Sequence, residues 1–260
     1  MRIFATIVAI ALSSGLSCPA MTQTAQAAAI TIVSGGAFKQ VLNAAAAQYR
    51  KASGSSVELV YRTVGQHLEL IRNGKETFDV AILTPAAIDG LTADGKVMPG
   101  SRTDLAKTGI GVVVKAGAPL PDISTVAAFK QTLLAAKSVA YIDPKAGGSS
   151  GIYIGRLLEC LGIAGAVNAK AVLVHGGSVA AHVANGEAEI GIHQISEILP
   201  VAGTVLVGPL PAEIQNFTVY AAGVGAQTHD AAAAKAFVKF LAGSEGAAIA
   251  RAKGLEPLAP

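Results

Sequence analysis

The 260-residue sequence is poor in the residues that mark nucleic-acid-binding, disulfide-bonded and metal-binding proteins. It has no tryptophan, and aromatic residues make up only 5% of it, which leaves few groups to stack on bases. Lysine and arginine are scattered without a run, so no basic surface for a nucleic acid is expected. The two cysteines, Cys18 and Cys160, show no Cys/His spacing that predicts a metal site.

Long apolar runs are also missing after residue 27, and the apolar run before it is short. Arg2, an uncharged apolar stretch at residues 3–16, and the small residues Ala25 and Ala27 are the three parts of a secretory signal peptide. The stretch is shorter than the roughly 20 apolar residues of a membrane-spanning helix. The sequence therefore predicts a signal peptide at residues 1–27, cleavage near Ala27 and a periplasmic protein. Without that segment one cysteine remains, which excludes an internal disulfide.

Strand-like and helix-like patterns alternate along the rest of the chain, which favours an α/β fold with a mainly parallel sheet. Two apolar strands, at residues 110–115 and 217–223, are candidates for crossing between two lobes. The expected division puts residues 28–111 and 218–260 in lobe 1 and residues 112–217 in lobe 2. A ligand would lie in the cleft between the lobes. A single doubly wound domain is the alternative.

The first loop that could bind a ligand is Ser34-Gly35-Gly36, which joins a strand to a helix. Ligands of open α/β sheets sit beyond the carboxyl ends of strands, where helix N-termini offer free N–H groups to anions. Gly35 and Gly36 would let the backbone approach the ligand closely, and Ser34 could donate from its hydroxyl. The alternative is a tight turn in which Ser34 only caps the helix.

The second loop, residues 62–67, again joins a strand to a helix start. Thr63 and Gln66 are possible donors, and Arg62 could pair with a carboxylate. His67 could carry charge or act as a base. A solvated histidine at a helix start is the alternative for His67.

The third loop, residues 145–151, is the richest in glycine and serine. Ser149, Ser150 and Gly151 open a helix that also bears Arg156, and Gln194 follows another strand. The loop lacks the Gly-Lys-Ser/Thr ending of a nucleotide-binding P-loop, so a nucleotide phosphate is not expected. No Gly-x-Ser-x-Gly elbow and no metal-ligand pair occurs, and neither a cofactor nor a metal is predicted.

Several segments of the chain resemble type II periplasmic solute-binding proteins of the molybdate-binding class: residues 34–38, 78–82, 150–153 and 183–192. The resemblance implies a two-lobed periplasmic-binding-protein type II fold with two hinge-crossing strands. It also implies oxyanion capture by hydroxyls and backbone N–H groups. The chain has Ala37, Val64 and Gln194 where that class presents two serines and a tyrosine. This departure moves the expected ligand from a metal oxyanion toward a carboxylate.

Other segments resemble aconitate isomerases, exported enzymes of the same superfamily. The similar segments are residues 34–36, 117–124, 129–133, 138–141, 150–153 and 194–197. The resemblance implies the transfer of an allylic proton in a tricarboxylate, which needs an acid/base group with a pKa near neutrality. His67 and Tyr153 are the candidates for that transfer, and Arg62, Arg156, Ser149 and Ser150 for binding the carboxylates.

Three functions therefore stay open. The leading expectation is a monomeric periplasmic binding protein that captures a small anion, a carboxylate or an oxyanion, for an ABC-type permease. The alternative is an enzyme like aconitate isomerase that interconverts cis- and trans-aconitate. A sensory or scavenging binder without a transporter is a third possibility.

Overall fold

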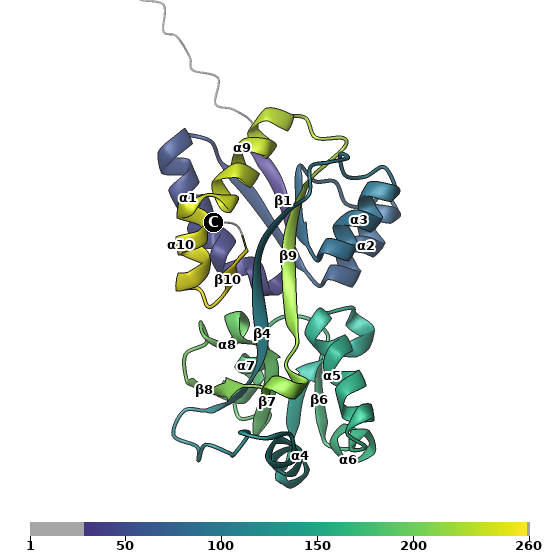
Figure 1. Ribbon diagram of the computed structural model, residues 1–260, viewed down its shortest axis with the longest axis vertical. Helices are drawn as coiled ribbons and strands as arrows, with labels where there is room; N and C mark the ends of the chain where they lie inside the picture. Colours follow the sequence, from purple (N-terminus) through teal and green to yellow (C-terminus); the bar gives the residue numbers. More distant parts are fainter. Residues whose placement is uncertain (1–28, 259–260) are drawn as a thin grey trace, which may run out of the picture.

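A computed structural model describes residues 29–258, so the predicted signal peptide lies outside the described residues. The chain forms two α/β lobes joined by the long strands β4 (Thr103–Lys115) and β9 (Phe217–Val224) (Figure 1). The two-lobed fold with two crossing strands is confirmed. Within the described range, no helix combines the length and the apolar character needed to cross a membrane.

Lobe 1 is built on the parallel strands β1 (Ile30–Gly35), β2 (Val57–Arg62) and β3 (Val80–Leu83), with β9 antiparallel to β3. Strand β3 is buried along its whole length, because helices cover both faces of the sheet. Figure 1 shows one group of helices on one face of this sheet and a second group on the opposite face. They are α1 (Lys39–Ser53), α9 (Ala231–Ala242) and α10 (Ser244–Ala252), opposite α2 (Val64–Arg72) and α3 (Pro85–Ala93).

Lobe 2 repeats this design with β5 (Val139–Ile142) between the parallel strands β6 (Ala171–Val174) and β7 (Ile190–Gln194). Strand β8 (Thr204–Pro209) pairs antiparallel with β4. The helices are α4 (Val126–Ala135), α5 (Ser149–Cys160), α6 (Ala164–Asn168), α7 (Val179–Ala184) and α8 (Ile195–Ile198). Short elements complete the chain: η1 (Gly36–Phe38), η2 (Pro144–Ala146), η3 (Ala212–Ile214) and β10 (Glu256–Pro257).

Strand β4 links the lobes because its two halves pair with different partners. Thr103 to Gly109 pair with β9 in lobe 1, and Ile110 to Lys115 pair with β7 and β8 in lobe 2. The sequence predicted only residues 110–115 as strand, because Asp104 and Lys107 interrupt the apolar pattern of the first half. The main path of the sheet therefore runs β2-β1-β3-β9-β4-β7-β5-β6 through both lobes. The division at residues 111/112 and 217/218 stays a prediction.

Candidate functional site

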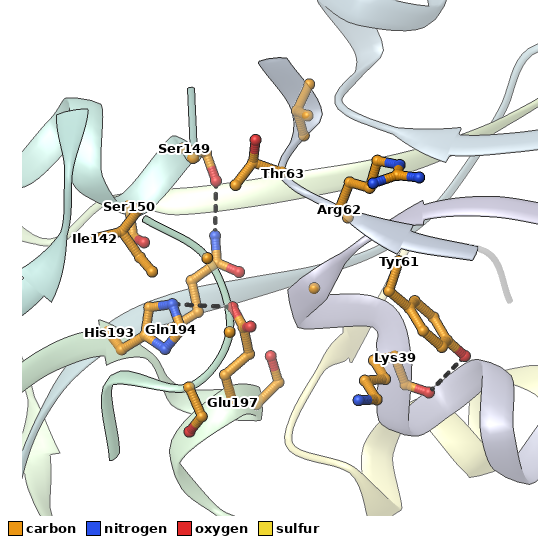
Figure 2. A pocket seen from close by; sticks show the side chains of 18 of the residues that line it. Lys39, Tyr61, Arg62, Thr63, Ile142, Ser149, Ser150, His193, Gln194 and Glu197 are labelled. Carbon is orange, nitrogen blue, oxygen red and sulfur yellow. Dashed lines mark hydrogen bonds and ion pairs between the residues drawn. The ribbon is translucent and has the colours of Figure 1, made fainter. Parts of the chain in front are cut away.

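A cavity of about 400 Å³ lies between the lobes, at the ends of strands from both (Figure 2). Lobe 1 contributes the turns after β1 and β2, and lobe 2 contributes the segments after β5, β6 and β7. The predicted site residues that line the cavity are Gly35, Gly36, Arg62, Thr63, Gln66, Ser149, Ser150 and Gln194.

The start of α5 is open toward the cavity. Gly148 is its N-cap and makes no side-chain capping hydrogen bond. The first N–H groups of a helix have no partner within the helix, and the positive end of the helix dipole lies there. With Gly148, Ser149 and Ser150 all lining the cavity, this helix start is suited to an anion.

The Gln194 amide fixes the orientation of the Ser149 hydroxyl. Gln194 Nε2 donates to Ser149 Oγ at 2.8 Å and to Thr218 Oγ1 at 3.0 Å, and Thr218 Oγ1 donates to Ser149 Oγ at 3.2 Å. Tyr220 donates to Gln194 Oε1 at 3.2 Å, so the Gln194 amide is satisfied within the protein. Ser149 Oγ accepts twice, which leaves its own proton to donate into the cavity. Gln194 thus acts on a ligand through Ser149.

The second predicted loop is closed by its own side chains. Thr63 and Gln66 form a capping box at the start of α2, so their polar atoms are already paired with each other's backbone. Thr63 Oγ1 also donates to the Ala146 carbonyl at 2.5 Å, a contact that links the two lobes. Arg62 lines the cavity but pairs with Glu76 at 3.2 Å. This loop contributes more to holding the lobes together than to donating to a ligand.

The glycines of the first loop pack closely, Gly36 against Glu197 across the cleft and Gly35 against Tyr220 of its own lobe. A Cβ added at Gly36 would lie 2.6 Å from Glu197 Oε1, and one at Gly35 would lie 2.9 Å from Tyr220 Cε1. Ser34 is fully buried, and its hydroxyl donates to the Gly35 carbonyl. Among the predicted residues of this loop, the two glycines line the cavity and Ser34 does not.

The two predicted proton carriers lie outside the residues that line the cavity. His67 is fully buried, with Nδ1 2.7 Å from Glu76 and Nε2 3.1 Å from the Ser34 carbonyl. Tyr153 donates its hydroxyl proton to the Ile214 carbonyl at 2.7 Å. Both side chains are therefore engaged in the scaffold.

Gly151 and Arg156 are also absent from the lining residues. A Cβ at Gly151 would collide with the Ile142 carbonyl, so this glycine lets α5 pack closely on β5. Arg156 is exposed on α5, two turns after its start. The structure gives Gly151 a packing role and leaves Arg156 on the surface.

The cavity is lined by an acidic residue that was not among the predicted site residues. Glu197, on α8, is the one acidic residue among the described lining residues, and its side chain is 19% exposed. Burial raises the pKa of its carboxyl from 4.5 to about 8, although the Lys39 ammonium acts in the opposite direction. At neutral pH this carboxyl is mostly protonated.

His193 and Ser196 complete the surroundings of Glu197. His193 Nε2 lies 3.2 Å from Glu197 Oε2, and burial lowers the pKa of the imidazole to about 4, so it is neutral at pH 7. Within residues 29–258, His193 Nδ1 and Ser196 Oγ have no hydrogen-bond partner although both are buried. Buried polar atoms without partners are rare, and both residues are among those that line the cavity.

One signal in the sequence marked this region. Residues 194–197 are among the segments that resemble aconitate isomerases, and Glu197 is the last of them. Its burial, however, comes from packing against Gly36 of lobe 1, which no local pattern reveals. Lys39 also lines the cavity and was not predicted, because its position in the sequence is typical of a surface residue at a helix start.

Comparison with known proteins identifies relatives over nearly the whole described chain. The model of the family described as bacterial extracellular solute-binding protein matches residues 30–256. An aconitate isomerase from a Pseudomonas species is 35% identical over 234 residues, which are 88% of this chain and 88% of the relative.

Solved structures show the same fold at lower sequence identity. The periplasmic molybdate-binding protein of Azotobacter vinelandii is 23% identical, with a TM-score of 0.76 over 89% of this chain and 99% of its own. PEB3, a Campylobacter jejuni protein, was solved with L-phospholactate bound. It is 14% identical, with a TM-score of 0.66 over 87% and 99% of the two chains.

Proposed function

Because this chain belongs to the bacterial extracellular solute-binding proteins, we propose that its interlobe cavity captures a small anion. The observation that carries the proposal is the open start of α5, where Ser149 presents a free hydroxyl proton beside unpaired backbone N–H groups. Lys39 and Arg62 are the cationic residues among the described lining residues, and they add a favourable field across the cleft.

A carboxylate fits this cavity better than a metal oxyanion. Its volume of about 400 Å³ falls in the range of pockets that enclose organic molecules. Two lining positions, Val64 and Gln194, also lack the hydroxyls of molybdate binders, and so does the buried Ala37 next to the lining residue Gly36. A small organic acid with two or three carboxylates is therefore the proposed ligand class.

Export and delivery to a transporter extend the proposal. The signal-peptide pattern at residues 1–27 and the membership of an extracellular family both support a periplasmic location. A permease of the inner membrane is the proposed partner, because proteins of this family type hand their ligand to a transporter.

Thermal unfolding with a panel of anions tests capture. The panel is molybdate, tungstate, sulfate, citrate, cis-aconitate and trans-aconitate. A ligand present at 100 times its Kd stabilises the folded state by about 2.7 kcal/mol, which raises Tm by several degrees. We expect the tricarboxylates to raise Tm. A shift with molybdate or tungstate alone would contradict the carboxylate assignment, and no shift with any anion would contradict capture itself.

A second candidate function is conversion of the ligand, as in aconitate isomerase. It is favoured by 35% identity to that enzyme over 88% of both chains, and by a carboxyl with a pKa of about 8 inside the cavity. Proton NMR of cis- and trans-aconitate incubated with the protein tests it. Interconversion would show an enzyme, and unchanged spectra alongside binding would leave a pure binding protein.

A further inference from the structure

We infer that Glu197 is the catalytic residue that moves the proton when an unsaturated tricarboxylate is isomerised in this cavity. The inference rests on the second proposed function and assigns its central step to a residue outside the two predicted from the sequence. It also names the substrate class: an acid with a C–H bond allylic to a double bond, held by carboxylates on both sides.

Glu197 lies at the edge of the cavity. Glu197 sits on α8 directly after β7, where the carboxyl ends of the lobe 2 strands meet the cleft. Figure 2 shows its carboxyl on the cavity side, beside His193 and across from Lys39. The side chain lines the cavity and is 19% exposed, so it borders the space that a ligand would fill.

His67, Tyr153 and Tyr220 are each unsuited to transfer a proton to or from the ligand. His67 is buried between Glu76 and the Ser34 carbonyl, and Tyr153 is bound to the Ile214 carbonyl, so neither reaches the ligand. Tyr220 lines the cavity, but burial raises the pKa of its phenol far above neutrality. Glu197 is the lining group whose pKa, about 8, suits proton transfer near neutral pH.

The residues around the Glu197 carboxyl set its orientation and its pKa. His193 Nε2 lies 3.2 Å from Oε2 and orients it, as a positioning residue that is neutral at pH 7. Gly36 leaves room for Oε1, because any side chain there would come within 2.6 Å of that oxygen. Lys39 lowers the pKa of Glu197, and Tyr220 is the remaining titratable neighbour that senses its charge.

The chemical step balances without any co-reactant. Ionised Glu197 removes one allylic proton from the CH₂ carbon, so that a C–H bond breaks and a delocalised allylic carbanion forms. The same carboxyl then returns the proton to the carbon at the far end of the allyl unit. The double bond moves by one position, a new C–H bond replaces the old one, and no atom is oxidised or reduced. The carbanion charge spreads into a carboxylate, which the open α5 start and Ser149 stabilise.

Glu197→Gln tests the assignment in the full-length protein. The carboxamide keeps the shape of the neutral carboxyl but cannot accept a carbon-bound proton. We expect turnover of trans-aconitate to fall by about 100-fold or more, the size of a general acid/base contribution. Deuterium uptake from D₂O into the allylic CH₂ should fall equally. Calorimetry should show tricarboxylate affinity within about threefold of the wild type, since binding does not need the base.

The pH profile separates catalysis from a structural role. In the wild type, kcat/KM should rise about tenfold between pH 7 and pH 9, as Glu197 ionises in the free enzyme. Residual activity of Glu197→Gln should lack that rise. If Glu197→Gln does not fold, Glu197→Asp keeps the carboxyl, and it should retain activity with a shifted profile.

Matched controls use residues outside the cavity. Glu159→Gln alters an exposed glutamate of α5, and Tyr153→Phe removes the predicted alternative carrier; both should keep turnover within about threefold. Full turnover by Glu197→Gln would overturn the role of Glu197 while the enzymatic function stands. Binding of aconitate by the wild type without turnover or deuterium uptake would overturn both, and would leave anion capture intact.

Discussion

The two walls of the cleft differ in what they offer a ligand. The lobe 1 wall carries the cations Lys39 and Arg62, but each already interacts with a side chain of the protein. Lys39 Nζ lies 5.4 Å from the centre of the Tyr61 ring, and Arg62 pairs with Glu76. The lobe 2 wall carries Ser149 with a free proton, and the Ser196 hydroxyl is buried there without a partner among residues 29–258. Lobe 1 thus supplies a solvent-screened attraction, and lobe 2 supplies short-range recognition.

The difference follows from burial. Exposed charges interact through water and salt, which weaken the attraction beyond about 10 Å. Buried hydroxyls and helix N–H groups act in a medium of lower polarity, where an unmade hydrogen bond is expensive and a made one is specific. We therefore expect substitutions in the lobe 2 wall to have larger effects than equivalent substitutions in the lobe 1 wall.

Gln194→Ala should have the largest effect on stability. It removes a fully buried amide that three side chains contact, and it leaves Ser149, Thr218 and Tyr220 without their partner. The free energy of unfolding should fall by about 2–4 kcal/mol, measured by denaturant titration. Gln66→Ala is the matched change in lobe 1, where only a capping box is lost, and it should cost about 1 kcal/mol. Equal losses at the two positions would contradict the difference between the walls.

Ser149→Ala should come next, with its effect on binding. The variant removes one hydrogen bond to a charged ligand, worth about 1.5–3 kcal/mol. The Kd for the anion should therefore rise by roughly 10- to 100-fold in calorimetry. Ser124→Ala alters an exposed serine that does not line the cavity, and provides the control. An unchanged Kd for Ser149→Ala would move the anion site away from α5.

Stability should depend on pH through Glu197. Its pKa is about 8 in the folded protein and near 4.5 when unfolded, so between these values the folded state binds more protons. The free energy of unfolding should therefore fall as pH rises from about 5 to 8, by roughly 1 kcal/mol given the partial access of solvent. Glu197→Gln should flatten this part of the curve. An unaltered slope would show that another group titrates.

Lys39→Met should have the smallest effect. An exposed ammonium contributes about 0–1 kcal/mol, so the Kd should rise by no more than about fivefold at low salt. At 0.5 M salt the variant and the wild type should bind alike, because the attraction is screened. A larger loss that persists in high salt would mean that Lys39 contacts the ligand directly.

Much of the fold could be predicted from the sequence, because its signals are local. The apolar pattern at residues 78–83 predicts a strand that the structure shows at residues 80–83, and the run at residues 139–142 is a strand as its pattern predicts. The first half of β4 escaped prediction. Asp104 and Lys107 face partly outward there, and only pairing with β9 makes the segment a strand.

The site could be predicted only in part, for the same reason. Strand–turn–helix patterns pointed to Gly36, Thr63 and Ser149, and the structure places these three residues around one cavity. They could not show that Thr63 is occupied in a capping box, or that His67 is buried against Glu76. Whether a polar group is free or engaged depends on neighbours that are distant in sequence.

The sequence by itself determined the α/β alternation and the helix starts that border the cleft, since periodicity and turn residues act over a few positions. The tertiary structure decided which helix start stays open, and it brought Glu197 of lobe 2 against Gly36 of lobe 1. Burial between segments far apart in the chain is what raises the pKa of that carboxyl, and burial is a property of the folded packing alone.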